Sequence, residues 1–206
     1  MSRQGRIRVR TAALALAVVA IAPVAVLAQP AVAAKKHATI PFAYKITATT
    51  HIKKLNQTVT PPTGTFKGTI DLTAETLSGN INLPPATFTT KLAGAVPLTA
   101  TAKIVQAKPV TGTINLSNFK VKATSTFNFL ITSAYAAGVP VNLVGNSCTT
   151  ATPVSVTMSG IASLSGASKF SGTFTITKFK SCGAATIALN QLIPGPGNTF
   201  SAVARP

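Results

Sequence analysis

Acidic side chains are almost absent from this chain of 206 residues, in which Asp71 and Glu75 are the only two. Glycosidases need two carboxyl groups about 5 to 9.5 Å apart, whereas residues four positions apart on a straight strand are separated by about 13 Å. Only a bend between Asp71 and Glu75 would bring them into that range. Catalysis by paired carboxylates therefore has little support.

Histidine and cysteine are equally scarce, with His37, His51, Cys148 and Cys182 as the only examples. A zinc site needs about four ligands, and a nucleophile needs a base to activate it. His51 lies beside Lys53 on a polar strand face, where a solvated histidine is the simpler interpretation. The sequence also lacks a Gly-x-Ser-x-Gly elbow, a dinucleotide fingerprint and a phosphate loop. We therefore predict a protein that is not an enzyme and that uses no cofactor or metal.

The first 34 residues have the features of a secretory signal peptide. Arginines at positions 3, 6, 8 and 10 precede an Ala-rich apolar run from Ala12 to Ala28, and small residues suited to cleavage follow up to Ala34. An uncleaved anchor is the less favoured alternative, because the run falls short of the ~20 residues of a membrane span and contains Pro23. We predict a secreted protein, loosely associated with the cell envelope, whose mature domain of residues 35–206 has no transmembrane anchor.

The two cysteines are predicted to form a disulfide in the oxidising compartment that this leader implies. The bridge between Cys148 and Cys182 would close 34 residues of chain. A metal ligand and a catalytic nucleophile are the alternatives, and both lack partner residues.

Apolar and polar residues alternate along many short segments, which is the pattern of half-buried strands. Residues 40–53 set the pattern, with most of their apolar side chains at even positions, and similar runs continue as far as residues 174–176, including one at 139–143. We count about ten to twelve strands, separated by Pro- and Gly-containing turns. The predicted fold is all-β, an antiparallel β-sandwich of jelly-roll or Ig-like type, with a barrel as the less favoured alternative. One short C-terminal helix is predicted over residues 184–193, ended by Pro194 and Gly195.

Two segments, 111–120 and 171–180, share Gly-Thr, an aliphatic residue and a final Phe-Lys at the same spacing. We interpret 97–120 and 153–180 as an internal duplication, with chance similarity of Thr-rich strands as the alternative. In each segment a bulge or bend would return the phenylalanine, Phe119 or Phe179, to the core.

Basic residues dominate the charge, which is +17 for the whole chain and +13 once four leader arginines are removed. Strand alternation places several lysines on outward faces, and we take these as candidate contacts to an anionic cell-wall polymer or to lipid headgroups: Lys45, Lys53, Lys67, Lys91 and Lys103. The alternative is that the lysines only solubilise the domain. Arginine and surface aromatics are too few for a dedicated nucleic-acid binder. Two other functions stay open: a carrier of a lipid or other apolar ligand between the sheets, and a structural or adhesive surface protein.

The C-terminal third resembles a group of secreted β-rich proteins of unknown function from actinobacteria. The resemblance rests on the Arg-studded leader, on the strand beginning SGTFTITKFKSCG and on the ATIALNQLIPGPGN that follows. It implies an extracellular location, a β-sandwich and a bridge between Cys148 and Cys182. It implies no activity, and no functional residue is carried over.

Acid denaturation arises mostly because carboxylates paired in the native state must take up protons. With two acidic side chains in the chain, we predict that the free energy of unfolding hardly changes between about pH 8 and about pH 3. Denaturant titrations at steps across this range measure it. A steep loss of stability around pH 4 to 5 would contradict the prediction.

Overall fold

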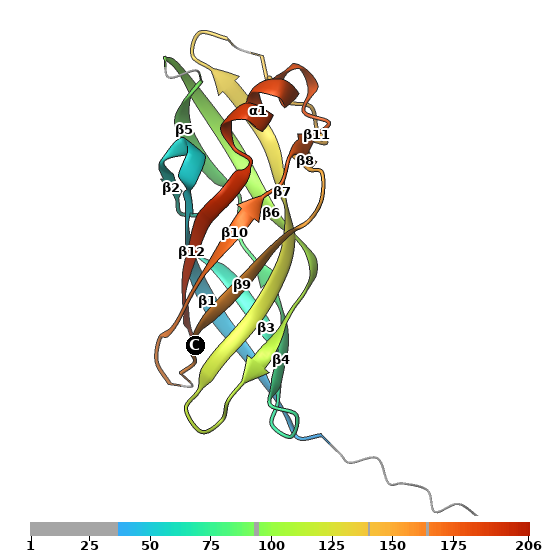
Figure 1. Ribbon diagram of the computed structural model, residues 1–206. Coiled ribbons are helices and arrows are strands. Elements are labelled where there is room, and N and C mark those ends of the chain that lie inside the picture. Colours follow the sequence, from blue (N-terminus) through green and yellow to red (C-terminus); the bar gives the residue numbers. More distant parts are fainter. Residues whose placement is uncertain (1–36, 93–94, 140, 164) are drawn as a thin grey trace, which may run out of the picture. The chain divides into compact units, whose positions relative to one another are not determined.

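Antiparallel strands make up most of the computed structural model, which describes residues 37–92, 95–139, 141–163 and 165–206 (Figure 1). The predicted signal peptide, residues 1–34, lies outside the described residues. In chain order the strands are β1 (Thr39–Ile52), β2 (Gln57–Val59), β3 (Gly64–Asp71), β4 (Thr76–Asn82), β5 (Ala86–Leu92), β6 (Val96–Ile114), β7 (Lys120–Ala136), β8 (Thr149–Thr150), β9 (Val154–Ile161), β10 (Ser168–Ile176), β11 (Phe179–Lys180) and β12 (Gly195–Arg205). The helical elements are η1 (Lys53–Leu55), η2 (Gly183–Ala185) and α1 (Thr186–Leu192). The all-β class and the short C-terminal helix are confirmed.

Eight of these strands pair in chain order and close into a ring. The sheet runs β7-β9-β10-β12-β1-β3-β4-β6, and β6 pairs in turn with β7. Every pairing in the ring is antiparallel, including the one between the first strand, β1, and the last, β12. The fold is therefore an up-and-down barrel, and the predicted two-sheet sandwich is wrong. Alternation with period two is the same for both architectures, which is why it did not separate them.

Even-numbered residues of β1 face the inside of the barrel, as the alternation predicted. Ile46, Ala48 and Ile52 are buried, and the odd-numbered Lys45 and Thr47 next to Ile46 are exposed. Apolar inward faces of the other strands complete a core at the centre of the closed sheet.

Some aromatic rings fit inside the barrel because glycines lie opposite them. Phe42 of β1 is opposite Gly68 of β3, and Phe170 of β10 is opposite Gly160 of β9. A Cβ atom on Gly160 would overlap the carbonyl oxygen of Lys169 and lie 2.8 Å from the Phe170 ring. A side chain at Gly160 would therefore force the neighbouring strand to shift.

The two similar segments occupy different settings. Phe179 is buried in β11, as predicted, whereas Phe119 is 39% exposed in the turn between β6 and β7. Phe119 has a φ of 55°, so the chain reverses at this residue and its ring stays outside the core.

The described residues of the run at 139–143, which are 139 and 141–143, do not form a strand, contrary to the prediction. Val139 and Val141 are 42% and 63% exposed. The Asn142 Oδ1 atom accepts hydrogen bonds from the backbone amides of Ala134 at 2.9 Å and Val144 at 3.3 Å. This side chain satisfies backbone donors that a strand ladder would otherwise satisfy.

The segment between β10 and β12, residues 177–194, forms a cap that contains β11, η2 and α1. It lies at the end of the barrel that also holds β8, away from the C-terminus (Figure 1). Leu189 and Ile193 of the cap are buried and belong to the same core cluster as Ile131 of β7. The cap therefore closes this end of the barrel with apolar side chains.

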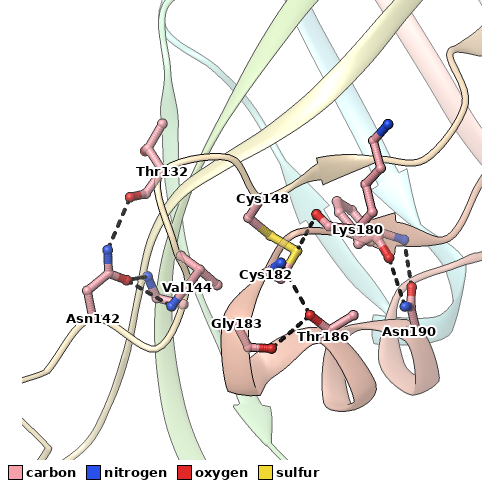
Figure 2. The surroundings of a disulfide bond; sticks show 11 residues. Thr132, Asn142, Val144, Cys148, Lys180, Cys182, Gly183, Thr186 and Asn190 are labelled. Carbon is pink, nitrogen blue, oxygen red and sulfur yellow. Dashed lines mark hydrogen bonds between the residues drawn. A yellow bond between two sulfur atoms is a disulfide. The ribbon is translucent and has the colours of Figure 1, made fainter.

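The predicted disulfide fastens the cap (Figure 2). Cys148, in the loop before β8, is bonded to Cys182 of the cap, with the Cα atoms 4.2 Å apart and neither residue exposed. The Cys182 amide donates to Thr186 Oγ1 at 3.2 Å. The Asn190 side chain accepts from the Phe179 amide at 2.6 Å and donates to its carbonyl at 2.9 Å. The described part of the chain contains no free cysteine.

Replacing an inward glycine should disturb the barrel wall. We predict that Gly160→Ala lowers the free energy of unfolding by about 1 to 3 kcal/mol, the range for overpacking a tight site. Gly145→Ala is the matched control, because its Cβ atom would have only the Ser181 oxygen nearby, at 3.6 Å. Urea unfolding of both variants measures the difference, and equal stabilities would show that the wall is not packed as described.

Removing the disulfide should loosen the cap. In the chain-entropy model, a bridge that spans 34 residues stabilises the fold by roughly 3 to 4 kcal/mol. We predict that the Cys148→Ser, Cys182→Ser double variant melts at a markedly lower temperature than the oxidised protein, in thermal unfolding followed by circular dichroism. An unchanged melting temperature would mean that the bridge does not constrain the chain.

Candidate functional site

Four cations follow one another around the outer surface of the barrel, one on each of four neighbouring strands. We call them the cationic row: Lys169 of β10, Arg205 of β12, Lys45 of β1 and Lys67 of β3. All four side chains are exposed. Lys45 and Arg205 are directly opposite each other in the pairing of β1 with β12. The central two cations therefore lie at the point where the first and last strands meet.

The outer two cations are offset by one outward position each. Lys169 is opposite Val203, the outward residue that precedes Arg205 on β12. Lys67 is opposite Ala43, the outward residue that precedes Lys45 on β1. Because diagonal neighbours in a sheet are within reach of long side chains, the four charges form one continuous row.

The row is electrostatically unfavourable by itself. Residues directly opposite each other in an antiparallel pair have Cβ atoms about 4.5 to 5.5 Å apart, and like charges there are destabilising. This separation is shorter than the Debye length of about 8 Å at physiological ionic strength, so salt does not screen the repulsion fully. Within the described residues, the one salt-bridge contact joins His37 and Asp71, and none involves a cation of the row. The row therefore has no salt-bridged acidic partner.

Neutral residues line the surface beside Lys169. An open depression of about 540 Å³ lies beside Lys169, between the outward side chains of β9, β10 and β12. Its lining includes Ser171, Ser201, Val203 and Ile161. Hydroxyl groups, short aliphatic side chains and a cation therefore share this part of the surface.

A fifth cation extends this surface. Lys120 of β7 and Lys169 of β10 are both opposite Ile161 of β9, which is 60% exposed. The positive surface therefore spans β7 to β3 through β9, β10, β12 and β1.

The structure brings together two of the five lysines predicted from the sequence. Lys45 and Lys67 belong to the cationic row. Lys53 begins η1 beyond the end of β1, Lys91 is opposite Pro97 in the pairing of β5 with β6, and Lys103 is on β6. These three are exposed but lie on other parts of the barrel.

Lys169 and Arg205 were missed as site residues. Their alternation with apolar neighbours marks them as outward, but the alternation does not say which strand lies beside them. Only the pairing of β12 with β1 and β10 shows which strands lie beside these two residues.

The acidic residue Asp71 lies on β3, four residues beyond Lys67, and pairs with His37 through a contact of 2.5 Å. The pKa of Asp71 is lowered from 3.8, chiefly because its carboxylate accepts a hydrogen bond from the Ala74 amide, with further bonds from His37 and the Thr73 amide. A lowered pKa adds stability that is present above 3.8 and is lost as the pH falls through the folded value. Asp71 therefore adds no acid sensitivity between pH 5 and 8.

Comparison with protein-family models, curated proteins and solved structures finds no match to this chain. In the part of the chain that the structure describes, no helix is long and apolar enough to cross a membrane. The same residues contain no group of three or more His, Cys, Asp or Glu side chains that could hold a metal ion.

Proposed function

We propose that this protein is secreted and that it binds an anionic cell-wall polymer, without catalysing a reaction, through the cationic row. The observation that carries the proposal is the direct opposition of Lys45 and Arg205, continued by Lys169 and Lys67, none of them in a salt bridge with any acidic group that the structure describes. Repulsion between the cations lowers the stability of the free protein, and a bound anion relieves this repulsion by supplying the missing negative charge. The leader sequence and the disulfide between Cys148 and Cys182 support an extracellular setting.

A polymer suits the row better than a small anion. Neighbouring strands lie about 4.8 Å apart, so the four strands of the row cover about 14 Å. An exposed row of single cations has no enclosed pocket around a lone phosphate, and each contact is weak in water. A chain with repeated phosphate or carboxylate groups contacts several cations at once, so the weak contacts add. The depression beside Lys169 gives the neutral backbone of such a chain a place to lie.

A nucleic acid is a poorer fit. Single-stranded nucleic acids need aromatic side chains on which bases stack. The outward neighbours of the row include Val203, Thr47, Thr65 and Ser201, none of which is aromatic. Phosphate-bearing or carboxylate-bearing glycans and polyols, which need no stacking, are the favoured class of partner.

Two charge-matched double variants test the site. Lys45→Gln with Arg205→Gln removes the centre of the row, and Lys91→Gln with Lys103→Gln removes two of the predicted cations that lie elsewhere. A basic residue near an anionic surface is worth about 1 kcal/mol, so we predict that the first pair weakens cosedimentation with isolated cell walls roughly ten- to thirtyfold. The second pair should have little effect. Retention of the unmodified protein should fall steeply with salt and should be lost on walls stripped of anionic polymer.

The same variants have a second readout. Because the row is self-repelling, the first pair should raise the free energy of unfolding at low salt by about 0.2 to 1 kcal/mol while it weakens binding. If both double variants weakened binding equally, the interaction would depend on net charge alone and not on the cationic row. Retention by anionic lipid vesicles but not by walls would assign the row to headgroups, and salt-independent self-association would favour the structural or adhesive alternative.

A further inference from the structure

The turn between β6 and β7 holds an aromatic ring outside the barrel. Phe119 is 39% exposed and has a φ of 55°. A bulky side chain is rare in this left-handed region, and it strains the backbone in a way that glycine or asparagine would avoid. Four described residues other than glycine have a positive φ, and Phe119 is the only apolar one of them. Neither the backbone nor the core therefore calls for a phenylalanine at this position.

Side-chain hydrogen bonds fix the conformation of this turn. The Asn115 Oδ1 atom accepts from the amides of Ser117 and Asn118, each at 3.1 Å. The Asn118 Oδ1 atom accepts in turn from the Lys120 amide at 3.0 Å. Asparagine side chains commonly stabilise turns by bonding the backbone two residues further on. The backbone on both sides of Phe119 is thus held in place, and with it the outward position of the ring.

A second exposed apolar side chain lies next to this turn. Ile161, the last residue of β9, is 60% exposed. The amide of the following residue, Ala162, donates to the Phe119 carbonyl at 2.9 Å. We call Phe119 and Ile161 the apolar tip. It lies at the end of the barrel away from the cap, where the turn between β6 and β7 is found (Figure 1).

Lysines flank the apolar tip. Lys120 of β7 and Lys169 of β10 are directly opposite Ile161, one on each side of β9. Lys122 is the next outward residue of β7, and all three lysines are exposed. Glu75 lines an open depression of about 560 Å³ together with Lys120 and Lys122, but in the described part of the chain no salt bridge joins it to either lysine. The apolar tip therefore has a rim in which cations outnumber acids.

The apolar tip is too small for a protein partner. A stable interface buries about 800 Å² on each partner. One aromatic side chain buries at most about 150 to 250 Å², and the tip exposes only part of two side chains. A lipid bilayer has no such minimum, because single aromatic and aliphatic side chains enter the boundary between headgroups and acyl chains. Anionic headgroups also attract lysines near the surface, so the tip and its rim together fit an anionic bilayer.

We propose that this end of the barrel binds the surface of an anionic lipid bilayer. Phe119 and Ile161 enter the headgroup region, and Lys120, Lys122 and Lys169 lie against the headgroup phosphates. Lys169 also belongs to the cationic row, but the apolar tip lies outside the row. The inference goes beyond the proposed function, which concerns a cell-wall polymer and involves no apolar side chain of the tip.

A tryptophan placed at the apolar tip tests the contact directly, because the chain contains no tryptophan of its own. In the secreted, oxidised protein, we expect the fluorescence emission of Phe119→Trp to shift to shorter wavelength when vesicles of phosphatidylglycerol and phosphatidylcholine are added. The control Val139→Trp replaces a residue that is 42% exposed in the loop between β7 and β8, and its emission should not shift. Vesicles of phosphatidylcholine alone should shift neither emission, because they do not attract the lysine rim.

Cosedimentation with the same anionic vesicles measures what each side chain contributes. Phe119→Asn should bind about tenfold more weakly, because the apolar ring no longer leaves water. The same variant should unfold at an equal or higher urea concentration than the unmodified protein, since asparagine accepts the left-handed conformation. Ile161→Thr should also bind several-fold more weakly, and the control Val139→Thr should bind as the unmodified protein does.

The proposal is overturned if the unmodified protein fails to sediment with anionic vesicles at low salt. It is also overturned if Phe119→Trp and Val139→Trp give equal shifts, or if Phe119→Asn and Ile161→Thr both bind as the unmodified protein does. Vesicle binding that depends on Phe119 belongs to the apolar tip and not to the cationic row. Cell walls should retain Phe119→Asn as they retain the unmodified protein, so the two proposals fail separately.

Discussion

The pairing of the first strand with the last is the interaction on which the rest of the structure depends. β1 and β12 face each other over seven residue pairs, from Lys45 opposite Arg205 to His51 opposite Thr199. Without it, the other seven pairings would leave an open sheet with two long edges, which natural proteins avoid because free edges recruit other chains. The same contact places Ile46 and Ala48 against Ala204 and Ala202 inside, and Lys45 against Arg205 outside. A like-charge pair costs at most about 1 kcal/mol, whereas each ladder hydrogen bond contributes about 1 kcal/mol, so closure prevails over repulsion.

Closure divides the protein into two chemical environments. Inside, aromatic rings lie against glycines, and the apolar space is closed at one end by the cap. Outside, lysines and hydroxyl-bearing residues face solvent almost without acidic partners. The proposed polymer site uses only the outer surface. β1 takes part in both environments, since Lys45 is exposed and Thr50 is buried.

Sequence patterns predicted the features of the fold that depend on residues close together in the chain. Alternation placed the inward and outward faces of β1, the Pro194–Gly195 pair ended the helix, and the leader with two lone cysteines predicted the disulfide. Alternation could not distinguish a sandwich from a barrel, because each strand buries one face in both. The run at 139–143 was mistaken for a strand because the competing bonds of Asn142 depend on Ala134, which lies eight residues earlier.

The sequence identified two of the four cations of the row, because local patterns show which residues face outward but not which strands lie side by side. Lys45 and Lys67 were identified as outward lysines, but their neighbours were unknown. Arg205 and Lys169 join them only through long-range register, which a single sequence does not encode in any local pattern.

Amide hydrogen exchange across β1 and β12 tests the closed sheet most directly. In a closed sheet β12 has a bonded neighbour on both sides, β1 and β10, so the account predicts slow exchange at consecutive amides of residues 199–204. If β12 were instead the edge of a separate sheet, every second amide would face solvent. Fast exchange at alternate residues of this stretch would contradict the closure, and with it the placement of Lys45 beside Arg205.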